Sequence, residues 1–335
     1  MPPSYDYPDP IHFRPNFTRE RIRACITKLS PYKASGPDEI PNIVLQQTVN
    51  LIIDHLYYIF QAIFALNVYH HHWQEFTIAV LRKPGKPSYE VPKAYRPIAL
   101  LCTMAKLLTG LVAEDVLHMA EKYELLPSMH FGGRPGRMTT DAIHILVDKI
   151  KDAWRRRKVV SVLFLDIEGA FPNAVNSILI HNMQKRRIPK VYTDFVENLL
   201  DGRTTRLRFD DYTSDSIQID NGIGQGDPLS MIAFLFYNAD LLDIAEYQNE
   251  STLAFVDDSL VAVEGDDFED TTSDLSFFMN REDGGFDWSK RHNSSFEIDK
   301  LAVMHCTNKR LCDPANARKS VPLPRPDLKL QGRVI

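Results

Sequence analysis

Three aspartates follow apolar segments of the sequence that have strong β propensity. Asp257 and Asp258 interrupt the run from Leu253 to Val263, and Asp166 comes directly after the run from Val159 to Leu165. Apolar and β-branched residues that run up to a carboxylate and then stop indicate buried strands with an acidic group at the tip. Neighbouring carboxylates beside an apolar layer repel each other and are costly to desolvate, and divalent cations between them would remove that cost. The pattern predicts that Asp166, Asp257 and Asp258 are catalytic metal ligands.

Magnesium is the ion that this donor set favours. Carboxylate oxygens that leave positions for water and phosphate suit Mg²⁺. Two such ions, about 4 Å apart, form the clamp that is used for in-line phosphoryl transfer. An isolated Asp-Asp pair is more often a turn dipeptide, so the interpretation depends on the third aspartate, Asp166, and on the motifs described below.

The composition of the chain is that of an ordinary globular protein. It has 335 residues, of which 44% are hydrophobic and 25% are charged, and its net charge is −5. A negative net charge argues against a protein that coats nucleic acid. Positive charge is instead clustered in residues 155–158, 185–187 and 203–208. Each cluster alone would be a solvated face, and together they would contact phosphates along a groove wall.

The cysteines and the apolar segments predict an intracellular protein. The four cysteines (Cys25, Cys102, Cys306 and Cys312) are scattered without zinc-ligand spacing, which favours free thiols in the nucleus or cytoplasm. The chain opens with a polar, proline-rich segment and not with a signal peptide. The most apolar stretch, residues 50–68, carries polar residues and predicts a buried amphipathic helix, so we expect neither secretion nor membrane association.

Helical and strand patterns alternate irregularly along the chain. Helices are predicted from about residue 18, over 41–67, up to about 122, from 138 to the Arg155 cluster, after Pro172, over 189–200 and after Pro228. Strands are predicted over 77–82 and 159–165, in a hairpin over 203–219 and in the Asp257–Asp258 hairpin. This order lacks the rhythm of a doubly wound sheet. It favours an α+β fold with an antiparallel sheet backed by helices.

Two glycine-containing loops carry further candidate residues. In the segment Asp166–Phe171, small Gly169 and Ala170 let the main chain approach a ligand closely, and Phe171 could lie under a sugar ring. In the segment 224–230, Gln225 and Gly226 offer a planar amide and a main chain without a side chain, as a base pair or sugar would require. Each loop alone also fits a plain turn or helix start.

Taken together, these motifs resemble a reverse transcriptase palm. The segments 166–171 (DIEGAF), 224–230 (GQGDPLS) and 255–258 (FVDD) occur in its order and approximate spacing. Upstream blocks match as well, at 36–41 (GPDEIP), 82–86 (RKPGK), 95–100 (YRPIAL) and 131–135 (FGGRP). The series is most similar to the reverse transcriptase of non-LTR (LINE-type) retrotransposons, nearest to the fungal Tad-like elements. It covers residues 30 to 335, and blocks in order are far more specific than any one of them.

The resemblance implies roles for individual residues. Asp166 and Asp257 would bind two Mg²⁺ ions, for which Mn²⁺ could substitute, and Asp258 would be a third carboxylate with an undefined share of the coordination. Lys83 and Arg96, in finger strands, would bind the incoming triphosphate, although Lys86 shares the loop of Lys83. Phe171 would be a steric gate against the ribose 2′-hydroxyl, and Gln225 and Gly226 would face the template–nucleotide pair. Lys300 resembles a palm lysine near the triphosphate, with a surface strand lysine as the alternative.

The resemblance also implies a right-hand fold with fingers and palm. We expect an N-terminal helical extension over 1–75, fingers over 76–157 and a palm with inserted helices over 158–310. The segment 311–335 would be a tail that ends before the primer grip and thumb, so the thumb would be missing or incomplete. Such a fragment is expected to extend a primer weakly or not at all, and a full-length protein would add an endonuclease and a thumb.

These features predict an RNA-directed DNA polymerase core that uses an RNA template, a DNA primer and dNTPs. The alternative is a truncated, catalytically silent module that binds RNA or serves as a scaffold. The three aspartates favour the polymerase, and the expected loss of the thumb favours the silent module. A metal-dependent nuclease would not explain the Gln225 loop or Arg96.

Overall fold

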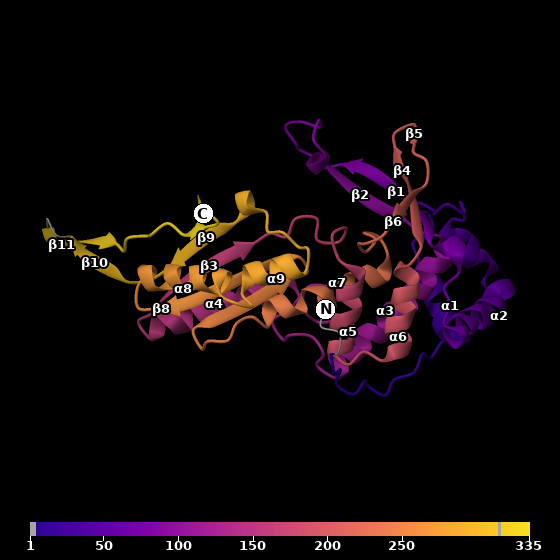
Figure 1. Cartoon of the computed structure of the whole chain (residues 1–335), viewed down its shortest axis with the longest axis horizontal. Helices are drawn as coiled ribbons and strands as arrows, with labels where there is room; N and C mark the ends of the chain where they lie inside the picture. The colour runs from indigo at the N-terminus through magenta and orange to yellow at the C-terminus, as the bar shows by residue number, and fades with distance from the viewer. Residues whose placement is uncertain (1–4, 314–315) are drawn as a thin grey trace. The chain divides into compact units, whose positions relative to one another are not determined.

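The chain folds into two compact units that interleave along the sequence (Figure 1). The computed structural model describes residues 5–313 and 316–335. Unit 1 extends to Leu125 and resumes over Phe171–Tyr237, and unit 2 comprises Leu126–Ala170 and Asn238–Ile335. Each unit therefore combines segments that are distant in sequence.

The helices of unit 1 form around apolar stripes with helical spacing. In the first of them, Thr18 Oγ1 accepts a hydrogen bond from the N–H of Arg21, while Glu20 and Lys28 complement the helix dipole at the two ends. The helices are α1 (Arg19–Lys28), α2 (Asn42–Leu66), α3 (Thr103–Lys122), α5 (Asn176–Lys185), α6 (Lys190–Leu200) and α7 (Pro228–Leu242), with short 3₁₀ turns η1 (His71–Trp73) and η2 (Pro92–Ala94). The last residues of α7, from Asn238, belong to unit 2.

Helix α2 is long and apolar enough to cross a membrane by length and composition, a property that core helices of globular domains share. One face of α2 is buried through Ile53, Leu56, Phe60 and Ile63. The Phe60 ring packs edge-on against Phe17 and Trp73. Its opposite face exposes apolar side chains, among them Leu51 at 77%. The predicted amphipathic helix is thus present, and its exposed face mixes polar side chains such as Asp54 and His55 with apolar ones.

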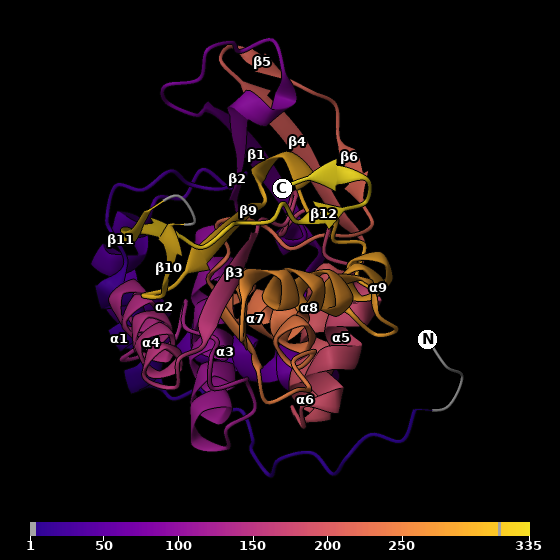
Figure 2. The same ribbon diagram turned by 90° about the vertical axis from the view of Figure 1, so that its left-hand side faces the viewer.

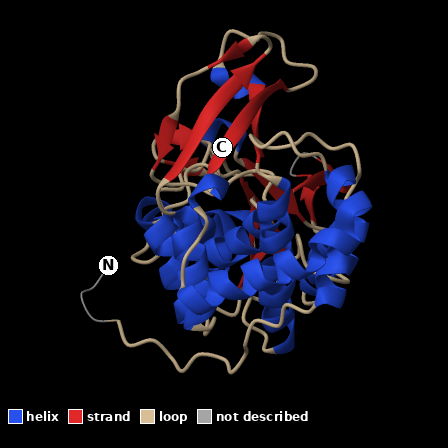
Figure 3. Cartoon of the chain, turned by 90° about the vertical axis from the view of Figure 1, so that its right-hand side faces the viewer, coloured by secondary structure: helices blue, strands red, loops and turns tan. Residues whose placement is uncertain are grey.

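Unit 1 contains a five-stranded sheet. Its strands are β1 (Glu75–Arg82), β2 (Tyr95–Leu100), β4 (Arg203–Phe209), β5 (Tyr212–Thr213) and β6 (Ile217–Ile219). β1 pairs antiparallel with β2 and parallel with β4, and β4 pairs antiparallel with β5 and β6. The sheet projects from the helices of the same unit (Figure 3).

Unit 2 is built on a four-stranded antiparallel sheet in the order β7-β8-β3-β9, of which Figure 2 labels β3 and β9. The strands are β3 (Val159–Leu165), β7 (Glu250–Phe255), β8 (Asp258–Gly265) and β9 (Ala302–Cys306). Central β3 is buried along almost its whole length, because helices cover both of its faces. Val160 and Val162 pack against α4 (Thr139–Arg155) through Leu146 and Ile150, whereas Ser161 on the other face bonds Thr271 of α8 (Phe268–Asn280).

Of the remaining elements of unit 2, a helix and a 3₁₀ turn precede β9 and two hairpins follow it. They are α9 (Gly285–Arg291), the 3₁₀ turn η3 (Ile298–Lys300), and the hairpins β10 (Arg310–Asp313) with β11 (Asn316–Pro322) and β12 (Lys329–Leu330) with β13 (Arg333–Val334). Leu328 and Leu330 are buried, so the last hairpin packs within the unit. The α+β prediction of an antiparallel sheet backed by helices is confirmed. The boundaries given for fingers, palm and tail stay predictions.

Candidate active site

A tight hairpin presents Asp257 and Asp258 in unit 2. Phe255 pairs with Asp258, so the turn between β7 and β8 consists of Val256 and Asp257 alone. Val256 has φ +62°, and a positive φ at the first of two turn residues is the pattern of a type II′ turn. Glycine is usual at that position and a β-branched residue is strained there. The strain sits next to Asp257.

Asp166 lies at the same end of this sheet. β3 pairs with β8 up to Leu165 opposite Ser259, and the next step of that register is Asp166 opposite Asp258. The segment after α9 holds the end of β3, because Glu297 N–H donates to the Asp166 carbonyl and Glu168 N–H donates to Ser295. The structure therefore brings together the three aspartates that the sequence analysis selected.

The three carboxylates interact unfavourably. Burial raises the pKa of Asp257 above its usual value, and the carboxylates of Asp258 and Asp166 raise it further. Burial and the Asp166 carboxylate likewise raise the pKa of Asp258. Across residues 5–313 and 316–335, no three acidic, histidine or cysteine side chains form a preassembled metal site. The donors nevertheless fit a divalent cation, because oxygen-only ligands that repel one another are stabilised by added positive charge.

Lys300 already supplies one positive charge to this group. Its Nζ lies 2.9 Å from Oδ2 of Asp166 and also pairs with Glu297. Hydrogen bonds to Glu297 and Asp166 raise the pKa of Lys300 to about 12. It stands in η3, just before β9. Its contact with Asp166 sets it apart from an ordinary surface lysine, while the predicted contact with a triphosphate stays a prediction.

The strained turn rests on a loop that precedes α4. The N–H of Phe131 donates to Ala254, and the N–H of Ala254 donates to Met129, so this loop runs along β7. A Cβ on Gly132 would lie 2.3 Å from Cγ2 and 2.8 Å from the nitrogen of Val256. Only glycine fits so close to the turn.

Asn238 holds the same turn from the end of α7. Its buried Nδ2 donates to the carbonyl of Val256 at 3.0 Å, and Nε2 of buried His130 lies 3.4 Å from that oxygen. These side chains fix the carbonyl that precedes Asp257. They compensate for the strain at Val256 and orient the carboxylate that follows.

The predicted steric gate stands at the start of the second segment of unit 1. The Phe171 ring is half-buried and stacks on Phe234 of α7, with ring centroids 4.9 Å apart and an interplanar angle of 19°. Gly169, with φ +57°, and buried Ala170 precede it. The ring is therefore held by packing and only partly exposed, and its role as a steric gate stays a prediction.

The Gln225 loop is joined to strand β2. The carbonyl of Gln225 accepts a hydrogen bond from the N–H of Ala99 at 2.8 Å, and the Gln225 side chain is exposed. Gly226 has φ +127°, and a Cβ there would lie 2.6 Å from the carbonyl oxygen of Ala99. The main chain thus approaches β2 in a way that only glycine permits. In the same strand, Arg96 is exposed.

Lys83 is less available than predicted. Its Nζ donates to the carbonyl of Lys93 at 3.0 Å, and its main chain bonds Ala94 and Tyr89. Lys83 therefore closes the loop between β1 and β2, in which Lys86 is exposed. Both lysines stay candidates for the triphosphate contact.

The basic clusters need one correction. Arg203 was grouped with Arg206 and Arg208 as a phosphate contact, but its side chain is buried and 5% exposed, whereas Arg206 and Arg208 are exposed. In the 155–158 cluster, Arg156 pairs with Glu264 and Lys158 pairs with Asp266. The grouping was wrong for Arg203, because side chains alternate along a strand and residue 203 faces away from residues 206 and 208.

Residues 81–305 match the family described as reverse transcriptase (RNA-dependent DNA polymerase). The chain belongs to the reverse transcriptase family. It is 29% identical over 308 residues to the probable RNA-directed DNA polymerase from transposon X-element of Drosophila melanogaster, covering 91% of this chain and 33% of that protein. It is 24% identical to the RNA-directed DNA polymerase from mobile element jockey of the same species, covering 87% and 32%.

These similarities identify a reverse transcriptase domain of the non-LTR retrotransposon type. The resemblance drawn from the sequence motifs is confirmed at this level, and the α+β fold with sheets backed by helices agrees with that family. The chain spans about a third of the length of these relatives. Reverse transcriptases as a family use divalent metal ions, which agrees with the donor set of the three aspartates.

Sequence reasoning missed Gly132, Asn238 and Arg203. Gly132 lies in a quoted motif, FGGRP, and a glycine pair there could have indicated a close main-chain approach. Asn238 is a polar residue in the apolar run of α7, which is a signal for a buried hydrogen bond. For Arg203 the signal was its odd position in a strand in which Arg206 and Arg208 are even, because such residues point to opposite faces.

Proposed function

We propose that this chain is the RNA-directed DNA polymerase core of a non-LTR retrotransposon. It would transfer a nucleotide from a dNTP to the 3′-hydroxyl of a DNA primer on an RNA template. The observation that carries the proposal is the placement of Asp166, Asp257 and Asp258 at one end of a sheet within a chain of the reverse transcriptase family. Fold alone would not support a reaction, but the coupled carboxylates do.

Asp166 and Asp257, with Asp258 beside them, would hold two Mg²⁺ ions, for which Mn²⁺ could substitute. When bound, the ions supply positive charge to the reacting phosphate and lower the cost of deprotonating the primer hydroxyl. The protein side chains position the other groups. Lys300 orients Asp166 through their 2.9 Å contact, Phe171 would exclude a 2′-hydroxyl, and Arg96 would hold the triphosphate.

Primer extension tests this proposal. The full chain is incubated with an RNA template, a DNA primer and dNTPs, with and without Mg²⁺, beside Asp257→Asn and Asp283→Asn. Asp283 is an exposed residue that pairs with Arg291, so it serves as the matched control for an aspartate change. We expect Mg²⁺-dependent extension that Asp257→Asn lowers at least about 10³-fold and Asp283→Asn leaves unchanged. Extension that survives Asp257→Asn would contradict the proposal.

A catalytically silent RNA-binding module is the second candidate. The observation that favours it is the ion pair of Asp166 with Lys300, which engages one carboxylate oxygen in the protein itself. The two functions differ in a simple comparison. If the chain is a silent module, it binds the RNA template but shows no primer extension with either Mg²⁺ or Mn²⁺.

Finer assignments belong to the same proposal. The motif series supports a place nearest to the fungal Tad-like elements, which a tree that includes such sequences tests. Free Cys25, Cys102 and Cys306 support a reducing location, nucleus or cytoplasm, which a fluorescent fusion tests; the side chain of Cys312 lies outside the described residues. The greater length of the relatives supports further domains, such as an endonuclease and a thumb, in a full-length protein.

A further inference from the structure

Arg203 is a buried cation that is held by main-chain oxygens. It is the first residue of β4, and its Nε donates to the carbonyl of Leu200 at 3.0 Å while one of its terminal nitrogens donates to the carbonyl of Gly222 at 2.6 Å. Within the described part of the chain, no carboxylate forms an ion pair with it. Burial lowers the pKa of Arg203 to about 10, and the nearby Asp227 opposes that shift. A buried charge without an ion-pair partner is costly and calls for a reason.

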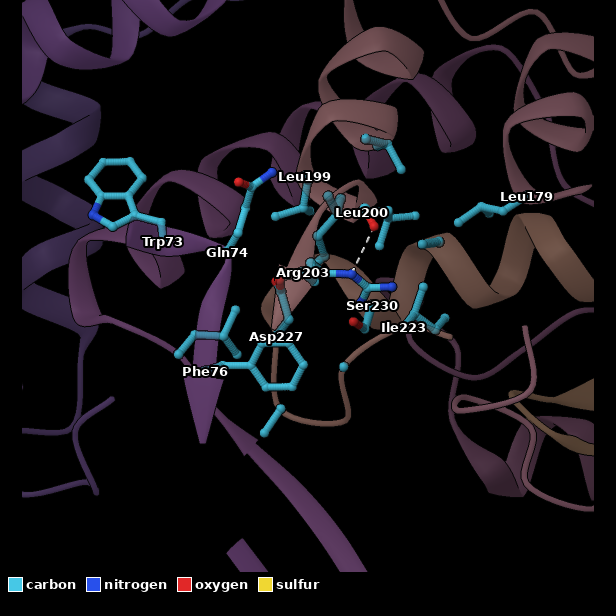
Figure 4. A pocket seen from close by; sticks show the side chains of 16 residues that line it. Trp73, Gln74, Phe76, Leu179, Leu199, Leu200, Arg203, Ile223, Asp227 and Ser230 are labelled. Atoms are coloured by element: carbon cyan, nitrogen blue, oxygen red, sulfur yellow. Dashed lines mark hydrogen bonds between the residues drawn. The ribbon is translucent and has the colours of Figure 1, made fainter. Parts of the chain in front are cut away.

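The environment of the Arg203 side chain is mainly apolar, so packing alone does not explain why a charged residue stands there. Arg203 and Asp227 border a cavity of about 30 Å³, lined mainly by apolar side chains that include Phe76, Leu199 and Ile223 (Figure 4). This volume is large enough to hold a water molecule. An apolar side chain would fill the position at lower cost. Unlike an apolar side chain, the forked guanidinium can donate hydrogen bonds to two carbonyls at once.

The two carbonyls connect helix α6 to the loop that carries Gln225. Leu200 is the last residue of α6, and Gly222 begins the loop that leads to α7. The N–H of Gly222 donates to Ala174 at 2.7 Å, and the N–H of Ile223 donates to Phe171 at 2.9 Å. Gly222 has φ +94°, and a Cβ there would lie 2.5 Å from the carbonyl oxygen of Pro172. The loop is therefore bound directly to the main chain of the predicted steric gate.

The other end of this loop is bound to β2. The carbonyl of Gln225 accepts from Ala99, which lies in the same strand as Arg96. A single loop thus links three residues that are predicted to contact the nucleotide: Phe171, Gln225 and Arg96. Arg203 holds the end of the loop nearest to Phe171. A small displacement there would move the ring relative to the sugar of the nucleotide.

We propose that Arg203 is a positioning residue that sets the selectivity of the site for dNTPs over rNTPs, by fixing the Gly222–Ile223 main chain against Phe171. The inference rests on the proposed polymerase function and adds a residue outside the nucleotide contacts. Exclusion of a 2′-hydroxyl depends on the ring position at a scale of about 1 Å. A lysine keeps the charge, but its single ammonium cannot hold both carbonyls in the fork geometry.

The test compares Arg203→Lys with wild type in the full chain. The measured quantity is the ratio of kcat/KM for a dNTP to kcat/KM for the matching rNTP. Arg19→Lys is the matched control, because Arg19 is a partly exposed arginine of the same unit that pairs with Asp54. We expect Arg203→Lys to lower the ratio about tenfold, mainly through better use of the rNTP, while kcat for the dNTP falls about threefold or less. Arg19→Lys should leave both values unchanged.

Hydrogen exchange gives a readout that does not require activity. In Arg203→Lys, the amides of Gly222 and Ile223 should exchange at least about tenfold faster, and the amides of the β7–β8 hairpin should keep the wild-type rate. Wild-type exchange at Gly222 and Ile223, or unchanged selectivity in an active Arg203→Lys, would overturn the inference. If the wild-type chain incorporates no nucleotide at all, the proposed function fails, and with it the selectivity role. In that case the hydrogen-exchange rates of Gly222 and Ile223 test only whether Arg203 stabilises the loop.

Discussion

Asp257 carries an electrostatic conflict in the metal-free protein. It is half-buried, and burial together with Asp258 and Asp166 raises its pKa. The charged form is therefore disfavoured in the folded state relative to the unfolded chain. Such a conflict is common at functional sites, where stability is lower than the fold would otherwise allow.

This conflict predicts opposite effects of one substitution on stability and on metal binding. Asp257→Asn removes one of the repelling charges, so the free energy of unfolding in the absence of divalent ions should rise by about 1 kcal/mol or less, given partial solvent screening. The stabilisation that Mg²⁺ gives to wild type should be lost. Urea unfolding with and without Mg²⁺ measures both. If Asp257→Asn is less stable than wild type and is still stabilised by Mg²⁺, Asp257 is not part of a group of repelling carboxylates that binds the ion.

Phe171 predicts a change in sugar selectivity. Phe171→Ala removes the ring that stacks on Phe234 and should admit rNTPs about 10- to 100-fold more readily, whereas Phe171→Tyr should stay selective. The ratio of kcat/KM for dNTP and rNTP is measured for each. Tyr32→Ala, at a residue that is 85% exposed, is the control. If Phe171→Ala keeps wild-type selectivity, the ring has only a packing role.

At this scale the sequence predicts carboxylates better than cations. Asp166, Asp257 and Asp258 stand out because apolar strands lead up to them, and burial of a strand is visible in its composition. Arg203 does not stand out, since its burial depends on the pairing of β4 with β1 and β6, which are distant in sequence. The contact of Lys83 could not be predicted from the local sequence either, because its Nζ donates to the carbonyl of Lys93 in η2.

Among the elements, the β7–β8 turn depends on the loop that supports it. Val256 adopts a conformation that favours glycine, and Asn238, His130 and Gly132 contact it. Backbone strain next to a predicted catalytic carboxylate persists only where the surroundings determine it. The loop around Gly132 is therefore a structural requirement for the position of Asp257.

Gly132→Ala tests this support. The new Cβ would meet Val256 at 2.3 Å, so either the turn or the loop must shift. We expect a loss of about 1–3 kcal/mol in the free energy of unfolding and a fall in primer extension of at least about tenfold. Gly110→Ala in α3 is the control, because its nearest neighbour is Pro228 at 3.9 Å and alanine favours a helix. Full extension by Gly132→Ala would contradict the supporting role.

Element prediction from sequence succeeded where the pattern is local. The predicted strand over 159–165 is β3, and the predicted helix over 189–200 is α6. The parallel pairing of β1 with β4 was not predicted. No local pattern specifies which distant strand completes a sheet, so that pairing requires the whole fold.

In the molecule as a whole, a buried ion pair joins the start of β7 to the end of α8. Arg281 and Glu250 have side chains that are 7% and 3% exposed, and both carboxylate oxygens accept hydrogen bonds from the guanidinium. The guanidinium also donates to the carbonyl of Ile244 and lies over the rings of Tyr247 and Phe278. Removing one partner would leave a buried, uncompensated charge.

Glu250→Gln should therefore destabilise unit 2 strongly. The expected loss is about 3–5 kcal/mol in the free energy of unfolding, measured by urea titration followed by fluorescence. Asp283→Asn, at an exposed ion pair, should change it little. Equal effects of the two substitutions would show that the buried pair contributes no more than a surface pair.

The most direct test of the polymerase proposal is single-turnover incorporation of one dNTP opposite an RNA template base. The full chain is compared with Asp166→Asn and Asp283→Asn in Mg²⁺. Because Asp166 lies at the end of β3 beside the Asp257–Asp258 turn, we predict that Asp166→Asn lowers the rate at least about 10³-fold and Asp283→Asn does not change it. Incorporation by Asp166→Asn at the wild-type rate would contradict the assignment of these aspartates as the catalytic centre.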